Sequence, residues 1–213
     1  MAKIESSFKN MALSLTLISL IASACLAFVY QITKGPIEAS VMNKKISAIK
    51  TVIPEFNNNP DAEMFRLPTG EGDSLDIYPA KKDGNLLGFV VNTYSPSGFS
   101  GNISLMAGFK TDGTIINIAV LEQKETPGLG TKMTGPEFKD QFNDKNPAEF
   151  VLKVKKDGGQ VDAITAATIS SRAFCDALQR AYKTLFTGKE WNDSAVPPVP
   201  GNTSQAEPIK DNN

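Results

Sequence analysis

The stretch VDAITAATISSRAFCDALQRAYKTLF covers Val161–Phe186 and begins with small and hydroxyl residues before it takes on a helical pattern. An amphipathic helix is predicted by apolar residues at helical spacing, namely Phe174, Ala177, Leu178, Ala181 and Leu185. A small-residue turn before a helix suits an anion, because free backbone N–H groups and the positive end of the helix dipole coincide there. The stretch therefore predicts a helix with an anion at its start.

Composition excludes several kinds of chemistry. The chain has 213 residues, a net charge of -1 and no histidine. A Ser-His-Asp triad, a Cys-His pair and any metal site that uses histidine are therefore ruled out within it. Two cysteines are too few for a disulfide framework. The balanced charge gives no indication of nucleic-acid binding.

An uncharged run extends from Asn10 to Thr33, between Lys9 and Lys34. As a helix it would be about 36 Å long, enough to cross a hydrocarbon core of about 30 Å. Residues 22–25, Ala-Ser-Ala-Cys, resemble a lipobox, but the run continues past Cys25 and favours an anchor helix over a lipoprotein. Lysines occur on both sides, so charge alone does not set the orientation.

Four regions are expected along the chain: a tail and membrane anchor over 1–34, a juxtamembrane helix and linker over 35–60, a folded domain over 61–191 and a disordered tail over 192–213. Pro36 allows a break or bend, and an apolar stripe predicts a second helix over Glu38–Thr51, close to lipid headgroups. The segment that ends at Asp73 is expected to be a loop. The polar, proline-rich composition after Trp191 cannot bury a core.

Alternating apolar residues predict an antiparallel sheet with one buried face. The runs are Leu87–Val91, Ile103–Phe109 and Ile116–Val120, and the turn signals are Asp83-Gly84 and Asp112-Gly113. A short helix is expected to begin near Pro136, followed by a strand over Phe150–Val154 and a turn at 157–159.

Two loops between these elements are candidates for ligand contact. Tyr94–Gly101, YSPSGFSG, has the composition of a long turn with two aromatic residues. Glu125–Lys132, ETPGLGTK, contains two glycines and a proline, which indicate a tight, exposed loop. It lacks the GxxxxGK[ST] spacing of a P-loop. Such a loop could let a planar ligand approach its backbone.

The motif ETPGLG at Glu125–Gly130, together with DAITAAT at Asp162–Thr168, resembles the FMN-binding domain family and, within it, the G subunit of the Rnf complex, the ion-translocating ferredoxin:NAD oxidoreductase. The N-terminus is also similar, with Glu5–Met11 before the apolar run and Thr33–Ile37 after it. The similarity covers roughly residues 1–187.

The resemblance implies an α+β fold with one membrane helix, an antiparallel sheet and a long C-terminal helix. It also implies that the Thr168 hydroxyl carries FMN through a phosphoester, installed by a separate Mg-dependent flavin transferase. The chain would then be an electron-transfer subunit of a membrane-bound ion pump, working with other membrane and redox subunits. The FMN domain would lie on the outer, periplasmic side of the bacterial cytoplasmic membrane. No residue is expected to act as an acid, base, nucleophile or metal ligand.

The expected cofactor contacts lie near Thr168 and in the two candidate loops. They are Thr165, Ala166, Ala167 and Ile169; Glu125, Thr126, Gly128, Leu129, Gly130, Thr131 and Lys132; and Tyr94, Gly98 and Gly101. Two positions depart from the family pattern. Ala166 stands where glycine is usual, so a backbone with positive φ there would be strained. Ile169 stands where a hydroxyl residue is common.

Two alternatives remain at this point. One is the C subunit of the sodium-translocating NADH:quinone oxidoreductase, which shares the covalent FMN and the topology. The short chain and the N-terminal sequence favour the Rnf assignment over it. The other is a non-redox, membrane-tethered binding domain in which Thr168 is unmodified.

Overall fold

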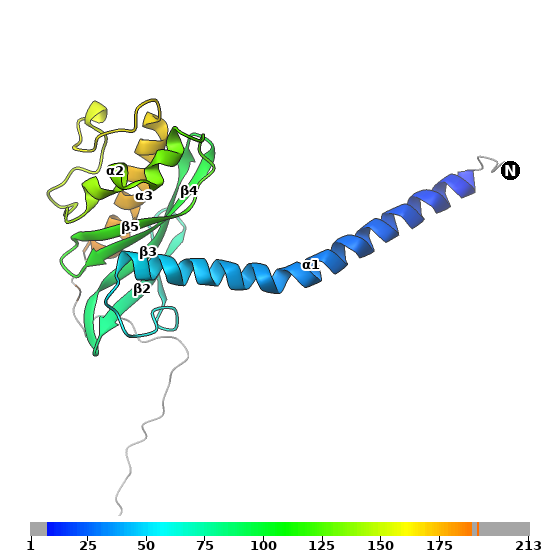
Figure 1. Cartoon of the computed structure of the whole chain (residues 1–213), viewed down its shortest axis with the longest axis horizontal. Coiled ribbons are helices and arrows are strands. Elements are labelled where there is room, and N and C mark those ends of the chain that lie inside the picture. Colours follow the sequence, from blue (N-terminus) through cyan, green and yellow to red (C-terminus); the bar gives the residue numbers. More distant parts are fainter. Residues whose placement is uncertain (1–7, 189–190, 192–213) are drawn as a thin grey trace, which may run out of the picture. The chain divides into compact units, whose positions relative to one another are not determined.

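The computed structural model describes residues 8–188 and 191. The chain divides into two units, 1–44 and 45–213, and helix α1 (Phe8–Val52) extends through the boundary between them (Figure 1). The apolar part of α1 is long and apolar enough to cross a membrane, by length and composition. Its side chains, such as those of Leu17 and Phe28, are exposed.

The helix predicted over Glu38–Thr51 is the continuation of α1 and not a separate element. Pro36 lies inside α1, which ends one residue later than predicted, at Val52. Proline removes one backbone hydrogen bond, and the turns on either side keep the others. The expected separation into two helices was therefore wrong.

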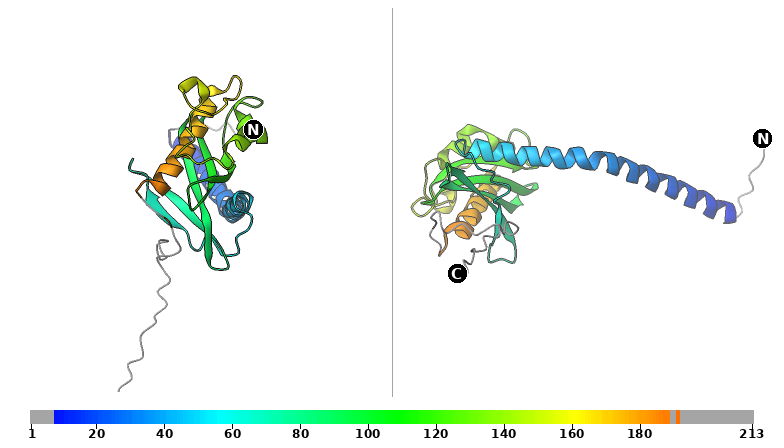
Figure 2. Two further views of the ribbon diagram at one scale, coloured as in Figure 1. Left: turned by 90° about the vertical axis from the view of Figure 1, so that its left-hand side faces the viewer. Right: turned by 90° about the horizontal axis from the view of Figure 1, so that it is seen from below.

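The second unit contains a five-stranded antiparallel sheet in the order β1-β2-β3-β4-β5 (Figures 1 and 2). The strands are β1 (Phe65–Pro68), β2 (Ser74–Lys82), β3 (Asn85–Gly98), β4 (Gly101–Lys110) and β5 (Ile115–Glu122). Each strand pairs with the next along the chain, which confirms the predicted α+β class with an antiparallel sheet. The predicted turns at Asp83-Gly84 and Asp112-Gly113 lie between β2 and β3 and between β4 and β5.

Strand β1 falls in the segment that was expected to be a loop. Its four residues are too few to show a period and include Pro68. Phe65 pairs with Ile77 of β2 and is buried. Pairing with a neighbour therefore makes this segment a strand.

The Tyr94–Gly101 segment is not the long turn that its composition indicates. β3 runs to Gly98 and β4 starts at Gly101, so that only Phe99 and Ser100 form the tip of the hairpin. The register shifts between Ser95 and Gly98, where a bulge absorbs the irregular sequence.

The long helix α3 (Thr168–Phe186) covers one face of the sheet and encloses the main core (Figure 2). All five residues of its predicted apolar face are buried: Phe174, Ala177, Leu178, Ala181 and Leu185. Thr93 of β3 donates a hydrogen bond to the Ala177 carbonyl at 2.8 Å. This bond satisfies a buried hydroxyl and fixes the helix along the strand.

The opposite face of the sheet is also covered, so the expectation of one buried face was wrong. Ala48, Ile49, Val52 and Ile53 form a second cluster with sheet residues Tyr78, Ala80, Val90 and Met106. Burial raises the pKa of Tyr78 to about 12. A Cβ on Gly108 would lie 2.1 Å from Val52 Cγ1, so the glycine permits the C-terminal end of α1 to approach the sheet closely. Val90 and Val91 are consecutive and both buried. Because successive side chains of a strand point to opposite faces, two consecutive apolar residues are the feature of the sequence that indicates a sheet covered on both faces.

Short elements connect the sheet to α3: η1 (Gly130–Thr134), α2 (Pro136–Lys139), η2 (Asp140–Phe142) and η3 (Lys155–Asp157). The predicted helix start at Pro136 is confirmed, as is the turn at 157–159, where Gly158 has φ +80°. The predicted strand over Phe150–Val154 is absent, and only a single parallel bridge joins Val154 to Val161. Leu152 and Val154 are buried in the core, which explains the apolar pattern without a strand. The predicted tail over 192–213 lies outside the described residues.

Candidate functional site

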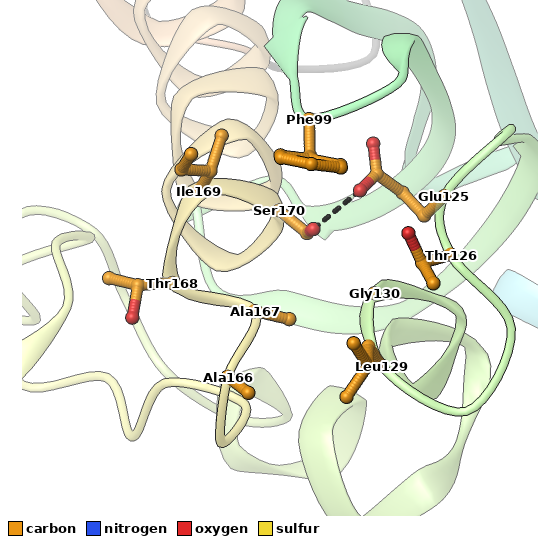
Figure 3. Close-up of a pocket in the computed structure, with 10 residues that line it drawn as sticks. All are labelled: Phe99, Glu125, Thr126, Leu129, Gly130, Ala166, Ala167, Thr168, Ile169 and Ser170. Atoms are coloured by element: carbon orange, nitrogen blue, oxygen red, sulfur yellow. Dashed lines mark hydrogen bonds between the residues drawn. The ribbon is translucent and has the colours of Figure 1, made fainter.

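A pocket of about 370 Å³ opens at the start of α3 (Figure 3). Three segments meet there: the tip of the β3–β4 hairpin, the loop after β5 and the turn that leads into α3. The lining residues are Phe99, Glu125, Thr126, Leu129, Gly130, Ala166, Ala167, Thr168, Ile169 and Ser170.

Free backbone donors surround the first turn of α3. Thr168 is the first residue of the helix, and Ala167 before it provides no side-chain cap. Counted from the start of α3, the first N–H that has an acceptor is that of Ser171, which donates to the Ala167 carbonyl at 3.0 Å. Within the described part of the chain, the N–H groups of Thr168, Ile169 and Ser170 have no acceptor. An anion bound at this helix start would satisfy them.

The turn before Thr168 is held in place by side-chain hydrogen bonds. Ser171 Oγ accepts from the Ile164 N–H at 2.9 Å and donates to the Ala167 carbonyl at 3.0 Å. Further back, Gln141 Oε1 accepts from the Asp162 N–H at 2.8 Å, and the Asp162 carboxylate pairs with Lys155 at 2.7 Å. The helix start is therefore presented by a turn of defined shape.

A bidentate ion pair fixes the other side of the same helix end. Arg172 donates from Nε and Nη2 to the two carboxylate oxygens of Asp157, at 2.6 and 2.7 Å. The hydrogen bond from Arg172 lowers the pKa of Asp157. The pair ties the η3 turn to the first turns of α3.

Ala166 adopts the left-handed conformation, with φ +61°. This agrees with the family pattern, which usually has glycine at this position. The turn needs this conformation in order to reverse the chain just before the helix. An L-residue with a Cβ is disfavoured there by roughly 1–2 kcal/mol. The domain therefore contains a strained residue two positions before Thr168.

We expect Ala166→Gly to stabilise the protein by about 0.5–1 kcal/mol, because the relief of strain exceeds the added entropy of the unfolded chain. Chemical denaturation of the full-length protein in detergent measures the change. Ala163→Gly is the matched control: Ala163 is exposed in the same loop and has no positive φ, so this variant should be destabilised. Equal shifts in the two variants would contradict the assignment of strain to Ala166.

A buried carboxylate links the three segments of the pocket. Glu125 is 4 % exposed, and its Oε2 accepts from Ser170 Oγ at 2.6 Å (Figure 3). Its Oε1 accepts from the Ser100 N–H at 3.0 Å. A Cβ on Gly130 would lie 2.6 Å from Ser170 Oγ and 2.7 Å from Glu125 Cβ, so this contact requires glycine.

Apolar side chains form the open walls of the pocket. Phe99 is 66 % exposed, Leu129 38 % and Ile169 46 %. These three residues come from the three different segments (Figure 3). A ligand with a flat apolar part would cover all of them while its anionic part reached the helix start.

The pocket brings together eight of the residues that the sequence predicted: Thr168, Ala166, Ala167, Ile169, Glu125, Thr126, Leu129 and Gly130. Thr165 and Lys132 line a smaller neighbouring pocket of about 230 Å³. Gly128, Thr131, Tyr94, Gly98 and Gly101 line neither pocket. Gly98 still contributes indirectly, because a Cβ there would lie 2.8 Å from Glu125 Oε1.

Tyr94 has partners elsewhere in the fold. Its hydroxyl donates to the Asp73 carboxylate, and Arg180 lies over its ring at 5.2 Å from the centroid. The hydrogen bond raises the pKa of Tyr94 and lowers that of Asp73. These contacts tie β3 to the loop before β2 and to α3.

One lining residue, Ser170, was absent from the predicted contacts. Phe99 lies within the range Gly98–Gly101 that was expected to contact the ligand, although only the two glycines of that range were named singly. Ser170 has no local signal of its own, because its role comes from Glu125, 45 positions away in the chain.

A sequence model of the FMN-binding domain family matches residues 98–183, a range that includes every residue of the pocket. The G subunit of the ion-translocating oxidoreductase complex of Methanosarcina acetivorans is 38% identical over 79% of this chain and 89% of its own length. The chain belongs to the G-subunit family of ion-translocating oxidoreductase complexes. Another relative is the G subunit of the Na(+)-translocating ferredoxin:NAD(+) oxidoreductase complex of Acetobacterium woodii, 32% identical over 77% of this chain and 84% of its own length.

The G-subunit relatives also bear on the alternative assignment to the C subunit of the quinone-linked complex. The crystal structure of NqrC from Shewanella oneidensis has 23% identity, covers 59% of this chain and 63% of that chain, and gives a TM-score of 0.41. The G-subunit assignment rests on the sequence relatives, such as the Methanosarcina acetivorans subunit with 38% identity.

Proposed function

We propose that this G-subunit homologue carries FMN covalently on Thr168 and transfers electrons within a membrane-bound, ion-translocating ferredoxin:NAD oxidoreductase complex. The observation that carries the proposal is the position of Thr168. It is half-buried on the edge of the pocket of about 370 Å³, in the turn where three consecutive N–H groups lack an acceptor among the described residues.

The residues present fit the two ends of FMN. The phosphate would accept hydrogen bonds from the N–H groups of Thr168, Ile169 and Ser170, where the helix dipole also favours negative charge. The isoalloxazine ring would lie against Phe99 and Leu129. The bound flavin supplies the redox chemistry, and the protein supplies its position and electrostatic surroundings.

Thr168 is favoured over the neighbouring threonines as the attachment site. Its hydroxyl has no hydrogen-bond partner in the described part of the chain, so attachment breaks no existing bond. Thr165 is exposed and faces the smaller pocket. Thr126 lines the main pocket but belongs to the loop after β5 and not to the start of α3, which carries the free N–H groups. In the proposed attachment, Thr168 Oγ1 loses its proton and forms a bond to the flavin phosphorus, while a phosphoanhydride bond of an activated flavin donor breaks and releases the rest of that donor. A separate flavin transferase would catalyse this exchange.

Electron donors and acceptors must belong to other subunits. The chain has two cysteines and no histidine, which is insufficient for an iron–sulfur cluster. Burial raises the pKa of Cys175 to about 12, so this thiol stays protonated and unreactive. We therefore place the chain between redox partners in a larger assembly, as the names of its relatives indicate for those proteins.

The apolar part of α1 would anchor the protein in lipid. We place the FMN domain on the outer, periplasmic face of a bacterial cytoplasmic membrane, the side that the family resemblance implies. A covalent link suits that location because it retains the flavin where no pool of free cofactor is required.

Mass spectrometry of the peptide that contains Thr168 tests the proposal. Protein purified from cells that contain the flavin transferase should yield this peptide with the mass of an added FMN moiety. Fragmentation should place the addition on Thr168 and leave Thr165 unmodified. An unmodified peptide under these conditions would favour a non-redox, membrane-tethered binding domain instead.

A further inference from the structure

Glu125 is a buried carboxylate without a cation. It is 4 % exposed, and none of the ion pairs formed within residues 8–188 and 191 includes it. Within those residues, the Glu125 carboxylate accepts two hydrogen bonds, one from the Ser170 hydroxyl and one from the backbone N–H of Ser100. Burial of a charge without a counterion is costly, and close packing alone would be served by a neutral side chain. A role for the charge itself would account for it.

The carboxylate also determines how the walls of the pocket face one another. Its bond to the Ser100 N–H holds the hairpin tip, where the neighbouring residue Phe99 lines the pocket. Its bond to Ser170 holds the first turn of α3, two residues after Thr168. One side chain therefore sets the distance between the aromatic wall and the attachment site.

We propose that Glu125 is a positioning residue for the flavin ring and that its fixed negative charge lowers the flavin's midpoint potential. The inference rests on the proposed function, since it needs FMN on Thr168. Reduction adds electrons to the ring, and a negative charge at its edge opposes this. The effect is large only where water is excluded, which the burial of Glu125 provides.

The two roles of Glu125 can be separated by substitution. Glu125→Gln preserves the shape and an acceptor for the Ser100 N–H but removes the charge. Glu125→Ala removes the charge and both hydrogen bonds. Ser170→Ala keeps the charge but removes one of its donors, which leaves the carboxylate less neutralised. Glu122→Gln is the matched control, because Glu122 is an exposed carboxylate at the end of β5.

The experiment uses full-length flavinylated protein in detergent. Redox titration with dithionite gives the midpoint potential; each ring takes two electrons from dithionite and the accompanying protons from the buffer. Flavin fluorescence anisotropy reports how firmly the ring is held. Mass spectrometry of the Thr168 peptide reports attachment independently of both measurements.

In Glu125→Gln we expect a midpoint potential at least about 30 mV more positive, which is a tenfold change in the equilibrium constant of a two-electron couple. Anisotropy should stay at the wild-type value. Ser170→Ala should have a potential at or below that of the wild type, and Glu122→Gln should match the wild type. In Glu125→Ala the anisotropy should fall as well.

Equal potentials in the wild type, Glu125→Gln and Glu122→Gln would overturn the role of the charge, and unchanged anisotropy in Glu125→Ala would overturn the positioning role. If Glu125→Gln does not fold, a potential in Ser170→Ala above that of the wild type would also overturn the proposal. Absence of FMN from the wild-type Thr168 peptide would instead refute the proposed function. The two failures are therefore distinguishable.

Discussion

Replacement of Thr168 by valine should abolish covalent flavin attachment completely. Valine has the same shape as threonine but no hydroxyl, so no phosphoester can form at this position. Thr168 is only half-buried at the first position of α3 and makes no side-chain hydrogen bond in the described part of the chain, so the fold should be retained. In-gel flavin fluorescence after denaturing electrophoresis, with co-expressed transferase, measures attachment. The wild-type band should fluoresce and the Thr168→Val band should not.

Thr165→Val provides the control for this variant. Thr165 lies three residues earlier in the same turn and lines the neighbouring pocket. Its hydroxyl is exposed, so its loss should have little effect on folding. The Thr165→Val band should remain fluorescent. A fluorescent Thr168→Val band would move the attachment site away from Thr168, and a dark Thr165→Val band beside it would move the site to Thr165.

The second large effect is expected at Gly130. Its substitution by alanine would place a Cβ 2.6 Å from Ser170 Oγ and 2.7 Å from both Glu125 Cβ and Glu125 Oε2. Glu125 Cβ is close to the backbone and cannot move aside, so the loop and the helix start must separate. We expect Gly130→Ala to lose about 1–3 kcal/mol of stability through overpacking. The pocket should also be distorted, so that a smaller fraction of the protein carries covalent flavin.

Chemical denaturation and in-gel fluorescence measure these two effects on the same preparations. Gly135→Ala is the matched control, five positions along in the same connection. A Cβ there would approach only the Lys132 carbonyl oxygen, at 3.3 Å. Its stability should fall by about 1 kcal/mol at most, because Gly135 is the N-cap of α2 and alanine is a poorer cap than glycine. A Gly130→Ala protein as stable as the wild type would show that the contact between Gly130, Glu125 and Ser170 is not tight in solution.

The local features of this protein could be predicted from its sequence. The apolar run, the hairpin turns at Asp83-Gly84 and Asp112-Gly113 and the buried face of α3 all follow from composition or period within a short window. The backbone conformation of Ala166 was also predictable from its own position, because the family pattern has glycine there. The structure has φ +61° at this residue. Such features are predictable because each segment carries its own signal.

Three of the expectations that the structure overturned concern segments whose partners are distant in the chain. Phe65–Pro68 becomes a strand because β2 lies beside it, and Phe150–Val154 does not become one because no strand is available to pair with it beyond a single bridge. Val52 and Ile53 cover the sheet face that was expected to be open. Period and propensity contain no information about these partners.

By itself the sequence determined the class of the protein: one apolar helix, an antiparallel sheet, a long final helix and two motifs whose spacing identifies the family. Only the tertiary structure decided how those motifs form a site. It brought Phe99 and Ser170 into the pocket, placed Tyr94 outside it and joined three segments through the Glu125 carboxylate. The physical reason is that a buried charge must find donors wherever the fold supplies them, and here they come from residues 25 and 45 positions away.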